Sequence, residues 1–217
     1  MTKPKPSAAA ETYYQADRLE MMKLLPATTK RVLELGCGAG GFGAAVKRQR
    51  GAEYWAIEYN ATVAENADRV LDRVLVGDAD ELVPELPDDY FDAIVCNDVL
   101  EHLARPDVTL DRLRPKLRTE GVVVASIPNI RYLPALAEVV FRRDFPTEDE
   151  GIFDRTHLRF FTRKSIRRMF EEAGYEMRSM KGINMANPLS VTIGLLSLGF
   201  FWDGVWMQYA CVASLRR

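Results

Sequence analysis

Residues 31–43 read RVLELGCGAGGFG, and this stretch decides the fold around which the rest of the chain is arranged. Val32, Leu33 and Leu35 form a short apolar run that glycines close abruptly, which is the pattern of a buried parallel strand. Glycine tolerates positive φ and lets a ligand approach the bare backbone. The helix expected over residues 44–50 presents its free N–H groups to that ligand, so the stretch predicts a nucleotide-binding corner.

Polar groups stand at the ends of four successive predicted strands. After the first strand, further strands are expected at residues 54–57, 74–76 and 91–96. Because the carboxyl ends of parallel strands share one edge of a sheet, the polar groups there are expected around one ligand. These groups are Glu34 near the end of the first strand, Glu58 after the second, GDAD at 77–80 and NDVLEHL at 97–103.

The glycine pattern alone does not decide between a dinucleotide and another nucleotide-bearing cofactor. Gly36, Gly38 and Gly41 satisfy the dinucleotide pattern G-x-G-x-x-G, which fits a nicotinamide-dependent oxidoreductase. A dinucleotide fold does not need the acidic and amide groups of the third and fourth strand ends. Those groups therefore favour a different nucleotide-bearing cofactor.

VLELGCGAG at 32–40, the strand end at Glu58, GDAD and FDAIVCNDVLEHL at 91–103 resemble the successive motifs of class I S-adenosylmethionine-dependent methyltransferases. The resemblance runs from about residue 13 to the C-terminus. It implies an α/β, doubly wound, Rossmann-like fold with a seven-stranded, mostly parallel sheet whose last strand is antiparallel. It also implies methyl transfer with S-adenosyl-L-methionine as cofactor.

Two later stretches carry a narrower resemblance. SIPNIRY at 126–132 and DRTHLRFFTRKSI at 154–166 are similar to a bacterial subgroup associated with polysaccharide and cell-surface sugar biosynthesis. This similarity implies O-methylation of a carbohydrate or another small acceptor, including an anionic one. Methyltransferases acting on a quinone, on another small molecule or on nucleic acid remain alternatives.

The resemblance implies a role for each residue of the cofactor site. The three glycines admit the methionine part and the ribose, and Glu34 orients the amino-acid end. Glu58 accepts hydrogen bonds from the ribose hydroxyls, Asp78 accepts one from the adenine amino group, and Asn97 offers its carbonyl to the methionine ammonium. As the alternative, each acid is a solvated strand-end or helix-capping residue. The expected cofactor-binding residues are Glu34, Gly36, Gly38, Gly40, Glu58, Asp78, Ala79 and Asn97.

His102 and His157 are the only histidines of the chain, and each lies inside a motif. A neutral imidazole near physiological pH can remove a proton from a hydroxyl, so both are candidate catalytic residues, unless they are structural. His157 is favoured as the base, because Arg155 and Arg159 would place an anionic acceptor beside it, whereas His102 is expected to shape the cofactor end of the pocket. Asp98 and Glu101 are further candidates. No metal is expected, because a sulfonium is already activated for methyl transfer.

A basic cluster surrounds the second histidine. Arginine forks suit phosphate and carboxylate groups, which favours an anionic acceptor held beside the catalytic residues. A solvated helix face is the alternative for the arginines at 163–168. The expected substrate-binding residues are Arg131, Tyr132, Arg155 and Arg159.

One domain is expected over residues 11–217, after a flexible tail at 1–10. A helix over 11–25 places Tyr13 and Tyr14 either in packing contacts or over the cofactor. The long connection at about 128–160 lies at the carboxyl edge of the sheet, so it predicts a lid that selects the substrate. The apolar segment 189–202 predicts a buried or dimer-covering helix, or a contact with a substrate tail or a membrane surface.

Composition narrows the remaining classes of function. The formal charge of −2 and the pI of about 5.8 give no electrostatic case for nucleic acid. Three scattered cysteines fit a reducing compartment and have no metal-type spacing. Without an apolar N-terminal segment or a span of sufficient length, neither a signal peptide nor a transmembrane segment is expected. The expectation is a cytoplasmic enzyme with a small-molecule or carbohydrate substrate, and a homodimer is a candidate assembly.

Overall fold

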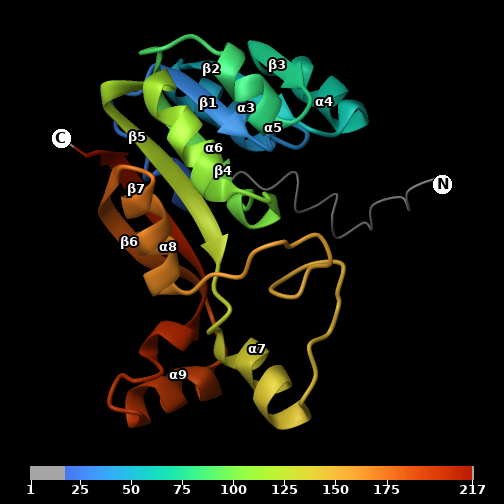
Figure 1. Cartoon of the computed structure of the whole chain (residues 1–217), viewed down its shortest axis with the longest axis vertical. Helices are drawn as coiled ribbons and strands as arrows, with labels where there is room; N and C mark the ends of the chain where they lie inside the picture. The colour runs from blue at the N-terminus through green and yellow to red at the C-terminus, as the bar shows by residue number, and fades with distance from the viewer. Residues whose placement is uncertain (1–17, 217) are drawn as a thin grey trace.

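The computed structural model describes residues 18–216 and contains a seven-stranded sheet in the order β3-β2-β1-β4-β5-β7-β6 (Figure 1). β1 pairs in parallel with β2 and β4, and β7 runs antiparallel to both of its neighbours. The predicted sheet with its antiparallel last strand is confirmed. The strands are β1 (Arg31–Leu35), β2 (Glu53–Glu58), β3 (Arg73–Val76), β4 (Phe91–Asn97), β5 (Leu117–Pro128), β6 (Tyr175–Met185) and β7 (Trp206–Leu215).

Helices cover both faces of this sheet. The longer ones have local sequence reasons to begin where they do: Asn60 caps α4 by accepting from the Thr62 and Val63 amides, and Thr162 and Ser165 form a capping box on α8. The helices are α2 (Leu19–Met22), α3 (Gly41–Arg50), α4 (Ala61–Asp68), α5 (Ala79–Leu82), α6 (Pro106–Leu113), α7 (Leu133–Ala137), α8 (Arg163–Glu172) and α9 (Pro188–Leu196). The short turns are η1 (Val83–Glu85), η2 (Leu100–His102), η3 (Arg114–Lys116), η4 (Glu138–Arg142) and η5 (Trp202–Val205).

The sheet separates two apolar layers. Successive side chains of a strand point to opposite faces, so Val32 packs in one layer and its neighbour Leu33 in the other. α2, α3 and α4 supply the first layer, and α6 and α8 supply the second. Because both faces are buried, the central strands are apolar along most of their length, and the acid Glu34 inside β1 stands out.

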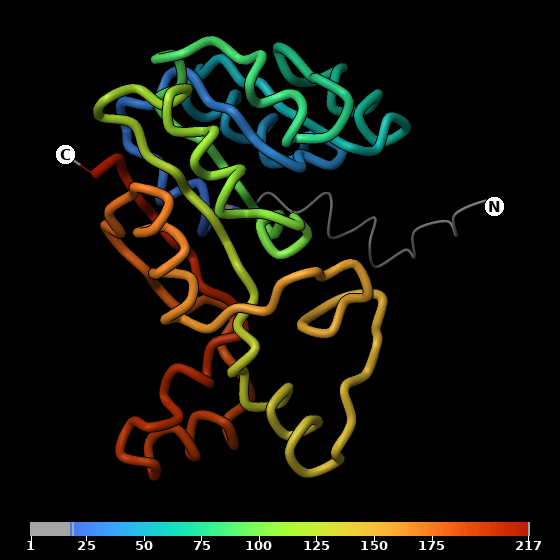
Figure 2. The backbone as a smooth tube through the Cα atoms, viewed as in Figure 1, coloured from blue at the N-terminus to red at the C-terminus, as the bar shows by residue number. Residues whose placement is uncertain are grey.

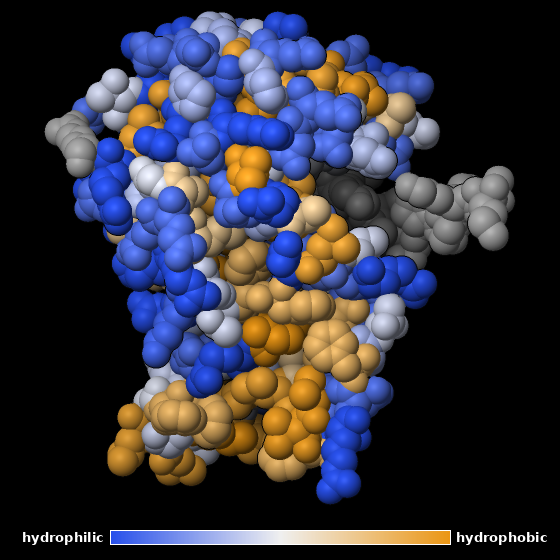
Figure 3. All heavy atoms as spheres, in the orientation of Figure 1, coloured by the Kyte–Doolittle hydropathy of each residue, from blue (hydrophilic) through white to orange (hydrophobic). Residues whose placement is uncertain are grey.

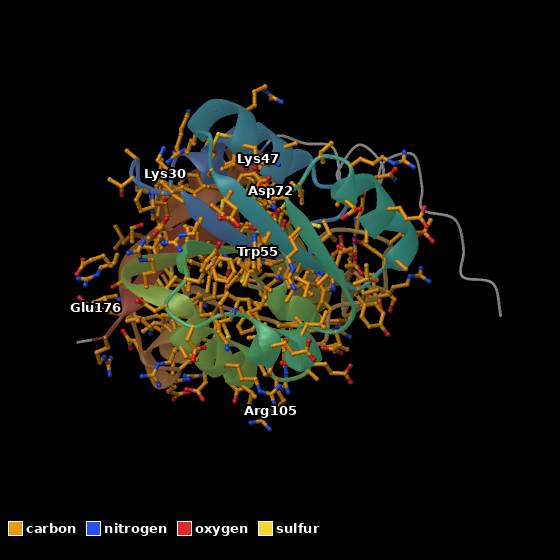
Figure 4. All side chains as sticks on the ribbon, turned by 90° about the horizontal axis from the view of Figure 1, so that it is seen from above. Lys30, Lys47, Trp55, Asp72, Arg105 and Glu176 are labelled. Carbon is orange, nitrogen blue, oxygen red and sulfur yellow. The ribbon has the colours of Figure 1, made fainter. Side chains whose placement is uncertain are left out.

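The glycine corner after β1 has two geometric reasons for its composition. Gly40 has φ 82°, a left-handed conformation that turns the chain into α3, so the helix begins at Gly41 rather than at the expected residue 44. A Cβ on Gly43 would lie 2.6 Å from the ring of Tyr54, so α3 packs closely on β2 only with glycine there. On the outer side of α3, Lys47 lies beside Asp72 and pairs with it at 2.8 Å (Figure 4).

The chain between β5 and α8 leaves the sheet, forms α7 and η4, and returns through a long loop (Figure 2). Buried Asn129 anchors the start of this excursion, since its side-chain amide donates to the carbonyls of Asp203 and Trp206 at 2.8 and 2.9 Å. Ile130 donates to the carbonyl of Phe161 at 2.8 Å and so joins the start to the end. The excursion is therefore a closed loop fixed at its base.

The apolar segment 189–202 is not one helix. α9 stops at Leu196, and the chain then turns through Leu198 and Gly199, which have φ 52° and 85°. Several of its side chains are exposed in the single chain, with Leu198 at 99%. Figure 3 shows apolar residues gathered over the lower part of the molecule, where Figure 1 places α7 and α9. Burial of this segment inside the chain, one of the alternatives that the sequence left open, is therefore wrong.

The predictions for the N-terminal segment concern mostly residues outside the described part of the chain. Tyr13, Tyr14 and the tail at 1–10 lie there, and of the helix expected over 11–25 the structure describes α2, which ends at Met22. Within the described residues, none of the helices is long and apolar enough to cross a membrane.

Candidate functional site

A cavity of about 240 Å³ opens at the carboxyl edge of the sheet, next to the ends of β1 and β4. The strand order reverses at β1, and open α/β sheets bind ligands at such a switch point. Three parts of the chain form most of the wall. They are the glycine corner (Glu34, Gly36, Cys37, Gly38), the end of β4 with η2 (Asn97, Asp98, Glu101, His102) and the loop residues Asp149, Glu150, Gly151, Asp154, Thr156 and His157.

Glu34 reaches this cavity from inside the sheet. Its carboxylate is 2% exposed and accepts a hydrogen bond from the Tyr54 hydroxyl at 2.9 Å. The Asn97 side-chain amide donates to its other oxygen at 3.4 Å. Burial raises the pKa of Glu34 to about 8, because the charged form loses its hydration. The group is suited to pair with a cation that enters the cavity.

The glycine corner fits a ligand that lies against the backbone. Gly36 and Gly38 have φ 67° and 54°, and a Cβ on Gly36 would lie 2.6 Å from a methyl of Val99. The carboxylate of Glu58 accepts from the Gly38 amide and from the Asn60 amide, each at 2.9 Å. Glu58 therefore holds the shape of the corner from the neighbouring strand.

The end of β4 contains a strained residue and an unpaired acceptor. Asp98 has φ 52°, and its carboxylate accepts from the Ser126 hydroxyl, the Gln208 amide and the Arg18 guanidinium. The buried side-chain carbonyl oxygen of Asn97 has no hydrogen-bond partner among the described residues. A buried acceptor without a donor is costly, so a ligand ammonium at this point would satisfy it. These residues fit the amino-acid end of S-adenosylmethionine.

The two histidines meet in the cavity wall although 55 positions separate them. Their ring centroids are 4.7 Å apart, and His157 Nε2 lies 4.0 Å from an oxygen of Glu101. Burial and the neighbouring His157 lower the pKa of His102. The pKa of Glu101 is raised well above its ordinary value, mainly by burial and then by the charge of Asp98.

Backbone hydrogen bonds attach the second histidine motif to the first. The amides of Leu158 and Arg159 donate to the Glu101 carbonyl at 2.9 and 3.0 Å. The Arg159 guanidinium donates to the carbonyl of Ala104, and His102 Nδ1 lies 3.2 Å from the carbonyl of Thr156. The loop after residue 143 thus ends on η2 and closes one side of the cavity.

The structure brings six of the predicted cofactor-site and catalytic residues into the cavity wall and leaves four beside it. Asp78 caps α5 by accepting from the Asp80 amide at 2.8 Å, and Ala79 is the first residue of that helix. The residues in the wall are Glu34, Gly36, Gly38, Asn97, His102 and His157. Those outside it are Gly40, Glu58, Asp78 and Ala79.

The four predicted substrate-binding residues lie outside the cavity wall. Arg131 pairs with Asp203 at 2.8 Å, and Arg155 pairs with Asp149 at 2.6 Å. Arg159 holds η2, as described above. Tyr132 lies before α7 and packs against the small apolar cluster of the excursion.

Several contributors to the site were missed from the sequence, and one of them is Arg18, which lines the cavity and pairs with Asp98. Tyr54 reaches Glu34 from β2, while Ser126 and Gln208 reach Asp98 from β5 and β7. Ser126 is the first residue of the SIPNIRY motif, so the motif could have indicated that Ser126 belongs to the site. Tyr54 and Gln208 lie in ordinary strand patterns, and only strand pairing places them at the site.

Comparison with known proteins agrees with this geometry. The model of a methyltransferase domain family matches residues 9–180. The ubiquinone biosynthesis O-methyltransferase of Aeromonas salmonicida is 29% identical over 167 residues, which are 74% of this chain and 68% of that protein. The protein of the same name from Psychrobacter arcticus is 28% identical over 173 residues, which are 74% of this chain and 64% of that protein.

A solved structure shows the same fold. The crystal structure of a SAM-dependent methyltransferase from Archaeoglobus fulgidus superposes with a TM-score of 0.72 at 19% identity, over 95% of this chain and 97% of that one. The cofactor is S-adenosylmethionine, and the oxidoreductase alternative is not favoured. With the family model covering most of its length, the chain belongs to the methyltransferase domain family and is an S-adenosylmethionine-dependent methyltransferase.

Proposed function

We propose that this enzyme transfers a methyl group to a hydroxyl oxygen of a small-molecule acceptor bound in the cavity beside η2. One observation carries the proposal. Two imidazoles and a buried carboxylate converge on the cavity wall directly after the strand end that contains Asn97. An oxygen acceptor benefits from such a group, because it must lose its proton as the methyl arrives.

The residues of the glycine corner and the neighbouring strand ends would hold the cofactor. Glu34 and the carbonyl of Asn97 would bind the ammonium of the methionine part. Glu58 would bind the ribose hydroxyls, which requires it to share or release the Gly38 and Asn60 amides that it now accepts from. Asp78 and Ala79 would bind the adenine at the end of β3.

Bound S-adenosylmethionine supplies a methyl on a sulfonium, so that the S–CH₃ bond breaks as the O–CH₃ bond forms and a neutral thioether leaves. The protein has to align the acceptor oxygen and take its proton. His157 Nδ1 lies 3.1 Å from the carbonyl of Ile152, an acceptor that requires the ring proton on Nδ1. Nε2 is then the free proton-accepting atom, and we propose His157 as the base and His102 as its partner.

A carbohydrate hydroxyl is the first acceptor class that we propose, on the resemblance of SIPNIRY and DRTHLRFF. The arginines expected to bind an anionic group are engaged by Asp203, Asp149 and the Ala104 carbonyl. The cavity wall also contains Glu150 and Asp154, while its cation Arg18 pairs with Asp98. This charge supports an uncharged acceptor over an anionic one.

An aromatic hydroxyl is the second candidate. It is supported by the names of the two relatives, both ubiquinone biosynthesis O-methyltransferases. Exposed apolar side chains of η4 and the following loop, such as Phe141 at 83% and Phe145 at 52%, offer contacts to an apolar acceptor.

The experiment is a methyl-transfer screen with nucleotide sugars, free sugars and dihydroxylated phenols, read by product mass and by the position of the new methyl. His157→Ala should reduce turnover about 10²–10⁴-fold with little change in cofactor affinity. His102→Ala should change both. Near-normal turnover of His157→Ala with an acceptor that His102→Ala no longer methylates would reverse the assignment, and transfer to nitrogen or carbon alone would refute O-methylation.

A further inference from the structure

We infer that Glu101, His102 and His157 form a binding site for one divalent first-row transition-metal ion whose open coordination positions face the cavity. The part of this inference that concerns the acceptor rests on the proposed function. It refines the last step of that function, because the imidazoles would act on the acceptor oxygen through a bound ion instead of taking its proton directly.

The three side chains already lie at nearly ligating distances. One ligand atom of each lies within 4.8 Å of the others, and the Nε2–Oε1 pair of His157 and Glu101 is at 4.0 Å. Metal–ligand bonds of about 2.0–2.2 Å place neighbouring ligands about 3–3.5 Å apart. Rotations that move the side-chain ends inward by roughly 1 Å would therefore complete the set.

Glu101 is the clearest sign that a ligand is missing from this cluster. The residue is 1% exposed, and neither carboxylate oxygen has a hydrogen-bond partner among the described residues. A buried carboxylate is normally paired, hydrogen-bonded or coordinated to a metal. Among the described residues, His157 Nε2 is an ion-pair contact of this carboxylate at 4.0 Å, which is beyond hydrogen-bond distance. A cation between the two groups would satisfy both.

Both imidazoles are oriented as ligating imidazoles are. His157 Nδ1 lies 3.1 Å from the Ile152 carbonyl, and His102 Nδ1 lies 3.2 Å from the Thr156 carbonyl. A carbonyl only accepts, so each Nδ1 carries the ring proton and each Nε2 retains its lone pair. Metal-bound histidines typically donate the other ring N–H to a carbonyl or carboxylate in this way.

The hydroxyl of Thr156 connects the imidazole of His102 to the carboxylate of Asp154. This hydroxyl lies 3.0 Å from His102 Nδ1 and donates to Asp154 at 2.6 Å. Because the hydroxyl proton goes to Asp154, the oxygen is left to accept from His102. An acid thus acts on the imidazole through a hydroxyl, which raises the basicity of the ligand atom.

The surrounding charge favours a cation. Asp149, Glu150 and Asp154 line the same cavity within the described residues; Arg155 pairs with Asp149, and Arg18 of the wall pairs with Asp98, so the field of Glu150 and Asp154 is what opposes an anion. Two imidazoles and one carboxylate form a donor set suited to Mn²⁺, Fe²⁺, Co²⁺ or Zn²⁺ rather than to Mg²⁺ or Ca²⁺, which prefer oxygen. An ion with three protein ligands keeps positions for an oxygen of the acceptor, and it would lower the pKa of that hydroxyl so that the proton passes to solvent water before the methyl arrives.

The first test uses the wild-type protein after removal of metals with a chelator. Titration calorimetry with MnCl₂ and ZnCl₂ should show one ion per chain. Long-range proton–nitrogen NMR of the imidazoles should show the Nε2 signals of both histidines shifting on addition of Zn²⁺, and the chain has no other histidine to confuse the signal. Absence of saturable binding, or binding that moves neither imidazole, would overturn the inference.

The second test compares variants in the same titration. Glu101→Gln and His157→Gln should each weaken Mn²⁺ binding at least about 100-fold. Glu172→Gln, an exposed acid on α8, is the matched control and should bind as the wild type does. The Co²⁺ spectrum should lack thiolate charge transfer, because buried Cys37 of the cavity wall is not a ligand. Equal affinity in all variants, or a thiolate spectrum, would contradict the site.

The experiments distinguish failure of the metal site from failure of the proposed methyl transfer to a hydroxyl. Circular dichroism and S-adenosylhomocysteine binding show whether a variant folds. If a variant does not fold, the NMR titration of the wild-type protein decides whether the metal site exists. A chain that binds no ion but methylates a hydroxyl after chelation refutes the metal site and leaves the function intact. A chain that binds the ion through both histidines but methylates none of the acceptors refutes the function and supports the site.

Discussion

Glu34 is a residue whose protonation responds to the cofactor. Burial raises its pKa to about 8, so most of the molecules carry the proton at pH 7. The ammonium and sulfonium of the cofactor favour the ionised carboxylate and lower this pKa. We therefore expect binding of S-adenosylmethionine at pH 7 to release up to about one proton per chain.

Calorimetry in buffers of different ionisation enthalpy measures this release. Glu34 is already ionised in the empty cavity at pH 9.5, so the release should vanish there. Glu34→Gln should bind without releasing a proton at pH 7. Equal enthalpies in all buffers for the wild type at pH 7 would show that Glu34 does not change its charge.

We propose that Glu58 binds the ribose hydroxyls of the cofactor. Glu58→Ala should weaken both S-adenosylmethionine and S-adenosylhomocysteine by about 1.5–3 kcal/mol, because a charged acceptor is lost. The same change frees the Gly38 amide and loosens the corner. Glu65→Ala, on the exposed side of α4, is a control of the same chemistry. Unchanged affinity in calorimetry would remove Glu58 from the site.

At the scale of the element, the excursion between β5 and α8 is placed to cover the cavity. Its loop supplies six wall residues, and Leu158 and Arg159 attach it to η2. We predict that residues 128–160 are protected from hydrogen exchange when cofactor and acceptor bind together. Peptides of α8 serve as an internal reference. Equally fast exchange with and without both ligands would argue against a lid.

At the scale of the whole molecule, cofactor binding and folding are coupled. The cofactor site that we propose joins the ends of β1, β2, β3 and β4, so a ligand there would stabilise the folded chain by mass action. S-adenosylhomocysteine at 100 times its Kd should add about 2.7 kcal/mol and raise Tm by roughly 5–10 °C. NAD at the same concentration should leave Tm unchanged. A matching rise with NAD would restore the oxidoreductase alternative, and scanning calorimetry measures both.

Local patterns were sufficient for the fold. The apolar runs of β1 and β4, the glycine corner and the capped helix α8 each depend on residues close together in the chain. The sequence also determined that Glu34 and Asn97 meet at one edge, because parallel strands in order leave little choice of geometry. It placed the boundaries less well where a single residue turns the chain, as at Gly40 and Leu198.

Contacts between distant segments decided the rest. Arg131 reads as a free cation in SIPNIRY, but Asp203, 72 positions later, pairs with it. From the sequence, His102 and His157 are alternative candidates for the base. Hydrogen bonds from the loop that contains His157 to the Glu101 carbonyl bring both histidines together with the buried carboxylate of Glu101. Local periodicity in the sequence determined the parallel strands and their strand-end acids, and the resemblance to class I methyltransferases implied the complete sheet with its antiparallel last strand. Only the tertiary structure decided which charges are paired and which are left facing the cavity, since pairing depends on loops whose course no local pattern specifies.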